Sequence, residues 1–346
     1  MSVTWKRRIL INDPISLDPV QIQQDLYSGN QVIVQFSDPS TYGSILDEVN
    51  ELCARFDENF GVRFYGHYSV SFDCETLLQI PNVKMLLLNC LRQAHNTNVL
   101  AKLNNLYSLS VGIYELENSE ILSIDTLRSL SILNISSEKK TLNLEYLKEI
   151  SRLEQLHVIG KVKNLDAIGD LEDLTYLALH SISNKPLHFI NRLKKLKELR
   201  ILLGGREHIQ DIEENEIESL EICRVRGFHD LSNISVFRAL KKLVIEDQIQ
   251  LREINFDQQM KTLEELTIMN CKTLAHLTGM EHLPFLHKLR IFKTAIDFDS
   301  FIEQELPIGL TTLEFATFKR KVDQEIQKTI VGLGYQNGIV YNENRG

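Results

Sequence analysis

The sequence predicts an α/β solenoid, in which short parallel strands form one sheet and return segments cover its outer side. Three observations lead to this fold class: an apolar-x-x-apolar-x-apolar phrase recurs along the chain, successive phrases begin 21 to 24 residues apart, and the apolar residues between phrases change to a spacing of three. A strand buries every second side chain, whereas a helical turn buries every third or fourth. The alternation therefore indicates one strand and one short helix in each unit.

The phrase is plainest where "LEELTI" at 263–268 returns as "LHKLRI" at 286–291. Between two phrases, the run "LDAIGDLEDL" at 165–174 places an apolar residue at every third position, as a 3₁₀ helix does. Ten consecutive spacings within so narrow a range are not plausible by chance. The eleven phrases begin at Val83, Leu106, Leu130, Leu153, Leu174, Leu196, Ile217, Leu240, Leu263, Leu286 and Leu310.

This period and phrase resemble those of the leucine-rich repeat family, over roughly residues 80 to 318. The resemblance implies one parallel strand and one return segment in each repeat. Many members hold Asn or Cys eight residues past the first apolar residue, where the side chain satisfies backbone groups of the turn. In this chain only Cys271 fits that pattern. We therefore expect other partners for the turns and an irregular solenoid.

Both ends of the array need caps, because a terminal repeat would otherwise expose its leucine layer and a strand edge. Residues 1–80 are predicted as an N-terminal βαβ cap continuous with the solenoid, with strands near 32–36 and 62–65 and a helix between them. Residues 81–318 hold about eleven repeats, and residues 319–346 form a C-terminal cap with a helix that ends at Gly332 and a last strand at 339–341.

The composition of the chain disfavours nucleic acid and membranes as partners. The 38 basic and 47 acidic residues give a net charge of −9, which repels nucleic acid and anionic membranes, and no apolar run approaches the ~20 residues of a membrane span. The five cysteines are scattered without a C-x-x-C pair, so they indicate reduced thiols rather than disulfides or a zinc site. We expect a cytoplasmic bacterial protein with no secretion signal and no cofactor.

The concave face of the predicted sheet carries the third, fifth and seventh places of each phrase, since side chains alternate along a strand. The first three repeat strands hold small and polar residues there, whereas later strands hold aromatic residues, Met and Arg, the types in which binding energy concentrates. The predicted partner-binding site lies on the middle strands, with a competing site at the C-terminal end: His157, Tyr176, His180, Glu198, Arg200 and Glu221, against Met269, Arg290 and Phe292.

A purely structural role stands beside this prediction. Arg200 is in register with Glu221, and Arg290 with Glu314, so these charges would neutralise each other across the sheet. An enzyme is a further alternative, because His157 and His180 fall on adjacent predicted strands. Only Glu198 offers a carboxylate near them, and no nucleophile or metal motif accompanies them.

The sequence thus predicts a non-catalytic protein-binding module that takes no small-molecule substrate. One version is an immunity protein that blocks a toxin or effector domain, since an acidic binder suits a basic active site. Another version is a regulatory adaptor or an effector-like scaffold. The least favoured version is a hydrolytic or metal-dependent enzyme that uses His157 and His180.

Overall fold

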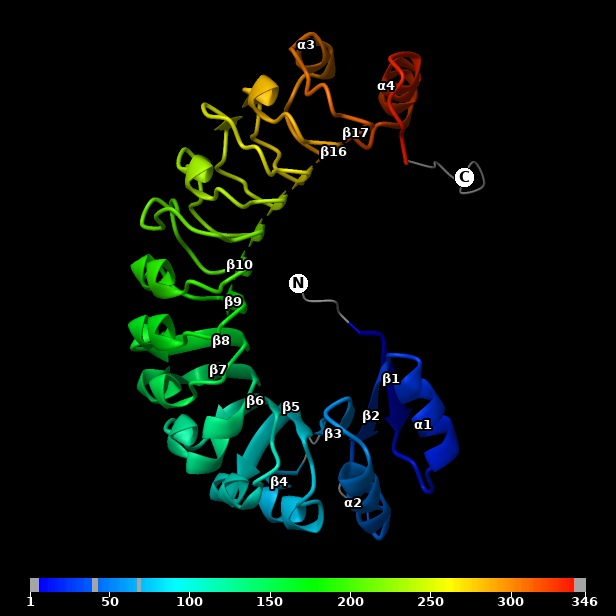
Figure 1. Ribbon diagram of the computed structural model, residues 1–346, viewed down its shortest axis with the longest axis vertical. Helices are drawn as coiled ribbons and strands as arrows, with labels where there is room; N and C mark the ends of the chain where they lie inside the picture. Colours follow the sequence, from blue (N-terminus) through cyan, green and yellow to red (C-terminus); the bar gives the residue numbers. More distant parts are fainter. Residues whose placement is uncertain (1–5, 39–42, 67–69, 339–346) are drawn as a thin grey trace. The chain divides into compact units, whose positions relative to one another are not determined.

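The structure, a computed structural model, describes residues 6–38, 43–66 and 70–338. The chain divides into two compact units, Met1–Leu177 (unit 1) and Ala178–Gly346 (unit 2), and each is described by itself. In each unit the strands of the main sheet lie on one side and the 3₁₀ helices on the other (Figure 1). We call the sheet face opposite these helices the inner face. The chain passes from unit 1 to unit 2 within β9 (Tyr176–His180).

Unit 1 begins with three parallel strands joined by two α-helices: β1 (Arg8–Asn12), α1 (Pro19–Tyr27), β2 (Gln31–Phe36), α2 (Ile45–Arg55) and β3 (Phe60–Phe64). The predicted βαβ segment corresponds to β2, α2 and β3, and the structure adds β1 and α1 before it. Helix α1 begins at Pro19 because the Asp18 side chain accepts hydrogen bonds from the amides of Val20 and Gln21, at 3.0 and 3.1 Å.

The repeats of unit 1 follow in the predicted order. Their leucines are in register from strand to strand, as Leu86, Leu109, Leu133 and Leu156 show, and each is at most 1% exposed. The elements are β4 (Phe72–Asp73), η2 (Cys74–Gln79), β5 (Met85–His95), η3 (Thr97–Lys102), β6 (Ser108–Leu116), η4 (Ile121–Ser123), η5 (Asp125–Ser129), β7 (Ile132–Asn143), η6 (Glu145–Glu149), β8 (Gln155–Lys163) and η7 (Leu165–Asp170). Strands β5 to β8 have 9 to 12 residues, so they continue past the predicted phrase.

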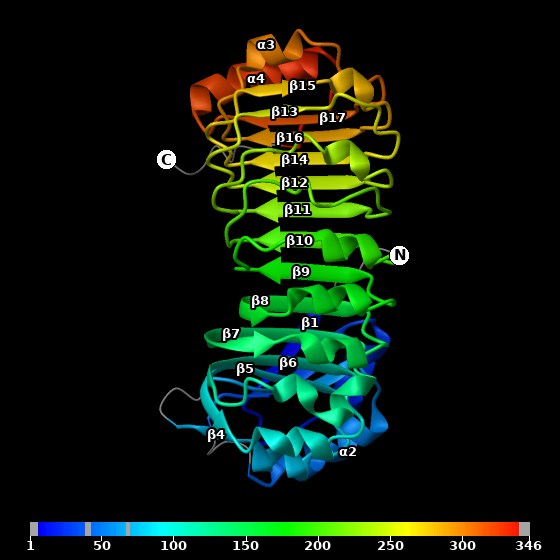
Figure 2. The same ribbon diagram turned by 90° about the vertical axis from the view of Figure 1, so that its left-hand side faces the viewer.

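Unit 2 repeats the same design with five-residue strands in its main sheet, which run parallel (Figure 2). Successive core leucines from Leu199 to Leu313 are paired in register and fully buried. The elements are η8 (His188–Arg192), β10 (Glu198–Leu202), β11 (Ser219–Cys223), η9 (Ile234–Val236), β12 (Lys242–Glu246), β13 (Glu253–Asn255), β14 (Glu265–Met269), β15 (His276–Thr278), η10 (Met280–His282), β16 (Lys288–Phe292), α3 (Phe298–Ile302), β17 (Thr312–Ala316) and α4 (Arg320–Gly332). All eleven phrases thus form strands, which confirms the predicted leucine-rich repeat architecture.

Helix α4 follows the last repeat strand, as predicted, and is joined to it by a buried carboxylate. Asp323 is fully buried and accepts hydrogen bonds from the amide and the hydroxyl of Thr317, both at 2.7 Å. Beyond the helix, Gln336 forms an isolated parallel β-bridge with Thr312 of β17. The last strand predicted at 339–341 lies outside the described residues. Within the described part of the chain, no helix has both the length and the apolar character needed to cross a membrane.

Each of the strands β9, β10, β11, β12, β14 and β16 is followed by a residue in the left-handed conformation. Six such residues have φ between 51° and 58°: Ser181, Leu203, Arg224, Asp247, Asn270 and Lys293. In two of these turns the residue after the left-handed one points inward, and its side chain forms hydrogen bonds with backbone carbonyl groups. Cys271 does so through Sγ, which lies 3.5 Å from the Met269 carbonyl oxygen. Gln248 is fully buried and donates Nε2 to the carbonyl oxygens of Ile222, at 3.2 Å, and Glu246, at 2.7 Å. This glutamine is one of the other turn partners that the sequence led us to expect.

Replacement of Gln248 by Leu should lower the free energy of unfolding by about 1–3 kcal/mol, because the Ile222 carbonyl loses a buried donor. Urea denaturation followed by circular dichroism measures this change. The matched control is Gln258→Leu at an exposed position, which should change stability by less than about 0.5 kcal/mol. Equal losses in the two variants would contradict the capping role.

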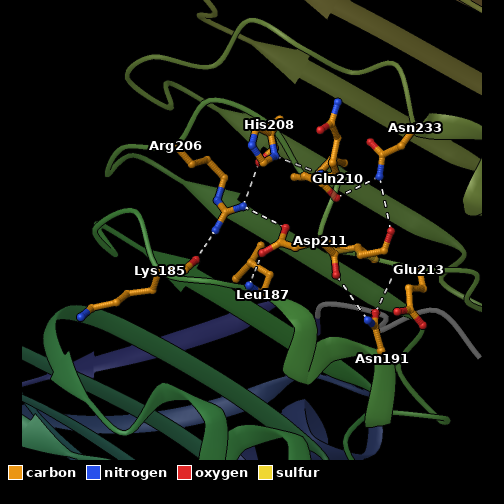
Figure 3. Close-up of polar contacts among 11 residues, drawn as sticks. Lys185, Leu187, Asn191, Arg206, His208, Gln210, Asp211, Glu213 and Asn233 are labelled. Atoms are coloured by element: carbon orange, nitrogen blue, oxygen red, sulfur yellow. Dashed lines mark hydrogen bonds and ion pairs between the residues drawn. The ribbon is translucent and has the colours of Figure 1, made fainter.

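The return segment between β10 and β11 contains no helix and is held by a buried arginine. Arg206 is 7% exposed and donates to the carbonyl oxygens of His208 and Lys185, at 2.8 and 2.6 Å (Figure 3). Its guanidinium also lies 3.5 Å from the Asp211 carboxylate, which accepts a hydrogen bond from the Leu187 amide. The Arg206 side chain therefore satisfies one carbonyl group of this return segment and one of the return segment before it.

An Arg206→Met variant should lose on the order of 3 kcal/mol of stability, because it leaves the carbonyls and Asp211 without their charged donor. Arg238→Met is the matched control, since Arg238 pairs with Glu214 on the surface and both side chains are more than half exposed. That surface pair should contribute less than about 1 kcal/mol. Thermal and urea unfolding of both variants compare the two losses, and a similar loss in the control would refute the structural role of Arg206.

Candidate binding site on the inner face of unit 1

A hollow of about 1150 Å³ lies on the inner face of unit 1. Its floor is formed mainly by β5 to β8, and residues of β1 and the ends of the long strands line its margins. In the middle of this floor β6 presents Ser108, Ser110 and Gly112, whose small side chains leave space above the sheet. The neighbouring strand β5 presents the larger Met85 and Leu87, which are 5% and 8% exposed.

The inner places of these four strands form three rows in register. Met85 and Leu87 pack with Ile33 of β2 in a small apolar cluster on this face. Met85 also lies over Gly61 of β3, where a Cβ atom would meet its sulfur at 2.7 Å. The twelve inner places include no Asp, Glu, Lys or Arg: Met85, Ser108, Ile132 and Gln155; Leu87, Ser110, Asn134 and His157; Asn89, Gly112, Ser136 and Ile159.

A chain of hydrogen bonds orients the polar floor at the β5 side. Arg63 of β3 donates Nε to Asn89 Oδ1 at 2.7 Å and Nη1 to Gln35 Oε1 at 3.1 Å. The Asn89 amide nitrogen then lies 3.4 Å from the Ser110 hydroxyl. The Arg63 guanidinium also covers the Tyr65 ring, 4.5 Å from its centroid. Asn89 therefore turns its oxygen to Arg63 and its nitrogen toward the hollow.

Charged side chains stand at the two margins of the hollow rather than on its floor. At the side where the strands begin, Lys6 donates to Asn59 Oδ1 at 2.7 Å and Arg8 donates to Gln31 Oε1 at 3.2 Å, and the exposed Glu58 lies in the same margin. We call this side the strand-start rim. It places cations, amides and a carboxylate around the entrance.

The opposite side, the strand-end rim, is formed by the extensions of β5 to β7. Lys139 pairs with Glu115 at 2.7 Å and lies 5.0 Å from the centroid of the Tyr114 ring. The hydrogen bond from Lys139 holds the pKa of Glu115 below its usual range, so this carboxylate stays ionised. Arg92 and Glu138 are exposed on the same rim.

Two predicted site residues, His157 and Tyr176, line this hollow. His157 lies on β8, in register with Asn134 of β7. Tyr176 is 5% exposed, and its amide donates to the Glu154 carbonyl oxygen at 3.1 Å. The ring is therefore packed into the wall of the hollow rather than held out into solvent.

The predicted charged residues of unit 2 form ion pairs with one another. Arg200 contacts Glu198 at 2.7 Å and Glu221 at 3.4 Å, and Arg290 contacts Glu314 at 2.9 Å. These side chains are between 12% and 31% exposed. The pairing agrees with the structural role considered from the sequence, in which charges neutralise each other across the sheet.

Met269 and Phe292, also predicted, are adjacent on β14 and β16 of unit 2. Phe292 meets the exposed Phe318 edge to face, with ring centroids 6.4 Å apart. Lys293 lies 4.7 Å from the centroid of the Phe318 ring. These side chains form a small aromatic patch on unit 2.

The small residues of β6 that line the hollow were not predicted as site residues: Ser108, Ser110 and Gly112. Their signal was present as three successive small inner residues on one strand. The prediction gave more weight to large side chains, whereas the space above the sheet arises where large side chains are missing.

Two buried cysteines of unit 1, Cys53 and Cys74, lie outside the lining of the hollow. Burial raises the pKa of Cys53 and of Cys74 to about 12, which keeps both thiols protonated. Among residues 6–38, 43–66 and 70–338, no group of three or more His, Cys, Asp or Glu side chains is arranged to hold a metal ion.

His180, the remaining predicted residue, is half-buried in unit 2, and burial lowers its pKa below the ordinary value of about 6.5. Below about pH 6.5 the His180 side chain is protonated more readily in the unfolded chain than in the folded chain. The stability that depends on neutral His180 is therefore complete above about pH 6.5 and is lost as the pH falls through the folded pKa.

Wild-type protein should accordingly lose more stability than His180→Gln between about pH 7 and about pH 5. Urea unfolding at a series of pH values measures the difference between the two profiles. His276→Gln, at an exposed position, should keep the wild-type profile. Superimposable profiles for wild type and His180→Gln would show that His180 does not contribute.

Comparison with known proteins gives similarity of structure only. No family model and no curated protein matches the sequence. A leucine-rich repeat protein of Leptospira interrogans is 15% identical with a TM-score of 0.46, over 89% of this chain and 89% of that chain. The APL1 leucine-rich repeat domain is 13% identical with a TM-score of 0.49, over 90% of this chain and 80% of that chain. Internalin C2 of Listeria monocytogenes is 19% identical with a TM-score of 0.35, over 49% of this chain and 67% of that chain.

Proposed function

We propose that this protein is a non-catalytic binding module and that the hollow of unit 1 holds a segment of a partner protein. The observation that carries the proposal is the size of the hollow together with its lining. Its volume of about 1150 Å³ exceeds the ~300–1,000 Å³ typical of small-molecule sites. Hydroxyl, amide and aliphatic side chains alternate on its floor, which suits the mixed polar and apolar surface of a polypeptide.

The lining favours binding over reaction. Catalysis of acyl or phosphoryl transfer needs a nucleophile or an acid–base pair within reach of one reacting atom. His157 is in register with Asn134 rather than with a carboxylate. The carboxylates of the lining, Glu58, Glu115 and Glu138, belong to the two rims, and Glu115 is paired with Lys139. We therefore assign His157 to the recognition surface.

The sequence leaves two identities for this protein. In the first, the protein is an immunity protein and the partner is a toxin or effector domain; the net charge of −9 supports it, because an acidic protein attracts a basic one over a distance. Since the inner places of β5 to β8 hold no Asp, Glu, Lys or Arg, this attraction would act on the approach of the partner rather than in the hollow. In the second, the protein is a regulatory adaptor. The cytoplasmic location stays a prediction.

The Ser110→Trp variant tests the site, because an indole on β6 fills the hollow from its floor. Affinity capture from the native source with wild-type protein, identification by mass spectrometry and titration of the purified partner provide the measurement. We expect the variant to bind at least about tenfold more weakly, a loss of about 1.4 kcal/mol, while circular dichroism and thermal unfolding stay those of the wild type.

Arg290→Ala combined with Phe292→Ala is the control on unit 2 and should keep wild-type affinity. The reverse result, with normal binding by Ser110→Trp and a loss in the double variant, would move the site to the C-terminal repeats. The immunity version further predicts that the captured partner is toxic when expressed alone and that co-expression of this protein restores growth.

A further inference from the structure

We infer that the segment held in the hollow is an uncharged, extended stretch of polypeptide that crosses strands β5 to β8 between the two charged rims. This inference rests on the proposed function and names the chemistry of the partner.

Charge is the first argument. The twelve inner places of β5 to β8 carry no Asp, Glu, Lys or Arg. A charged partner side chain that reached the floor would lose its water without meeting a counter-ion at any of these places, which costs several kcal/mol per ion. The cation beside the floor, Arg63 of β3, already donates to Asn89 and Gln35. The inner face of unit 2 differs, since Arg200 and Arg290 each meet carboxylates there. The hollow thus selects against charge in the segment that it covers.

Hydrogen bonding is the second argument. Hydroxyls of Ser110 and Ser136 and amides of Asn134 and Gln155 both donate and accept. The backbone of an extended segment offers the same two functions at every residue, so these side chains match it without any requirement for charge. Ile132 and Ile159, which lie in the same rows, offer apolar contacts for small aliphatic side chains of the segment.

Direction is the third argument. The strand-start rim and the strand-end rim stand at opposite ends of the strands, so the uncharged channel between them runs across the strands. Three spacings of ~4.8 Å between β5 and β8 give a floor ~14 Å long, which holds about four or five residues of extended chain at ~3.3 Å each. Charged residues of the partner are therefore expected beside the rims or beyond this short stretch.

The test uses a phage-displayed library of random peptides of about twelve residues, panned on the full-length protein. Ser110→Trp serves for counter-selection, and Ser219→Trp, which makes the same change at an inner place of β11 in unit 2, is the matched control. Selected peptides are then synthesised and titrated by calorimetry at about 0.05 M and about 0.5 M salt, where screening differs strongly.

We expect the selected peptides to share an uncharged core of about four or five residues. Their affinity should change less than about threefold between the two salt concentrations, fall at least about tenfold in Ser110→Trp and stay unchanged in Ser219→Trp. Cores rich in Asp, Glu, Lys or Arg, or affinity that falls steeply with salt, would overturn the inference. The inference would also be overturned if the library gave no peptide that binds the wild type and not Ser110→Trp. Neutral glycans on an array that bind the wild type and not this variant would overturn it as well.

These results separate the two proposals. If the natural partner is blocked by Ser110→Trp while the selected peptides are charged, the hollow remains the binding site and the uncharged segment is wrong. If the natural partner binds Ser110→Trp normally, the proposed function of the hollow fails, whatever the library yields.

Discussion

The fold depends on the register of the leucine layer. Each repeat strand places its apolar residues against those of the strands on either side, and Leu266 paired with Leu289, then Leu289 with Leu313, show the alignment directly. A slip of one residue would turn every core side chain to the opposite face. Because the buried face is fixed in this way, the inner face is also fixed: its side chains must form straight rows, one from each repeat. Function can therefore be altered along a row without any change of backbone.

The hollow is a product of those rows. Over β6 the rows contain two serines and a glycine, over β5 they contain Met85 and Leu87, and the difference in side-chain size creates depth on a sheet whose backbone is regular. Charged side chains lie at the ends of the strands instead, where Lys139 and Glu115 pair. Side-chain composition thus changes the inner face while the backbone stays regular, so unit 1 and unit 2 can share one architecture and present different chemistry.

The sequence predicted the repeat strands well because each carries its own signal in the phrase. It did not predict β1 and α1, since "RILIN" and "PVQIQQDLY" lie outside the repeated period and Leu10 and Val20 are exposed. For the site, register alone correctly placed Arg200 beside Glu221. It could not reveal that Arg200 also bends back to Glu198 on its own strand, because that contact depends on side-chain rotamers. Nor could it reveal an empty space, which belongs to no single residue.

The left-handed residues at the ends of the strands of unit 2 have a consequence for cooperativity. Leu203, Arg224 and Lys293 are not glycine, and an ordinary side chain in this conformation costs roughly 1–2 kcal/mol. A lone repeat has no means to hold such a turn, whereas a repeat between two neighbours is held by strand pairing on both sides. The unfavourable turns thus penalise partially assembled arrays more than the complete one. Local strain, spread along one edge of the sheet, acts as a check that the neighbouring repeats are already in place.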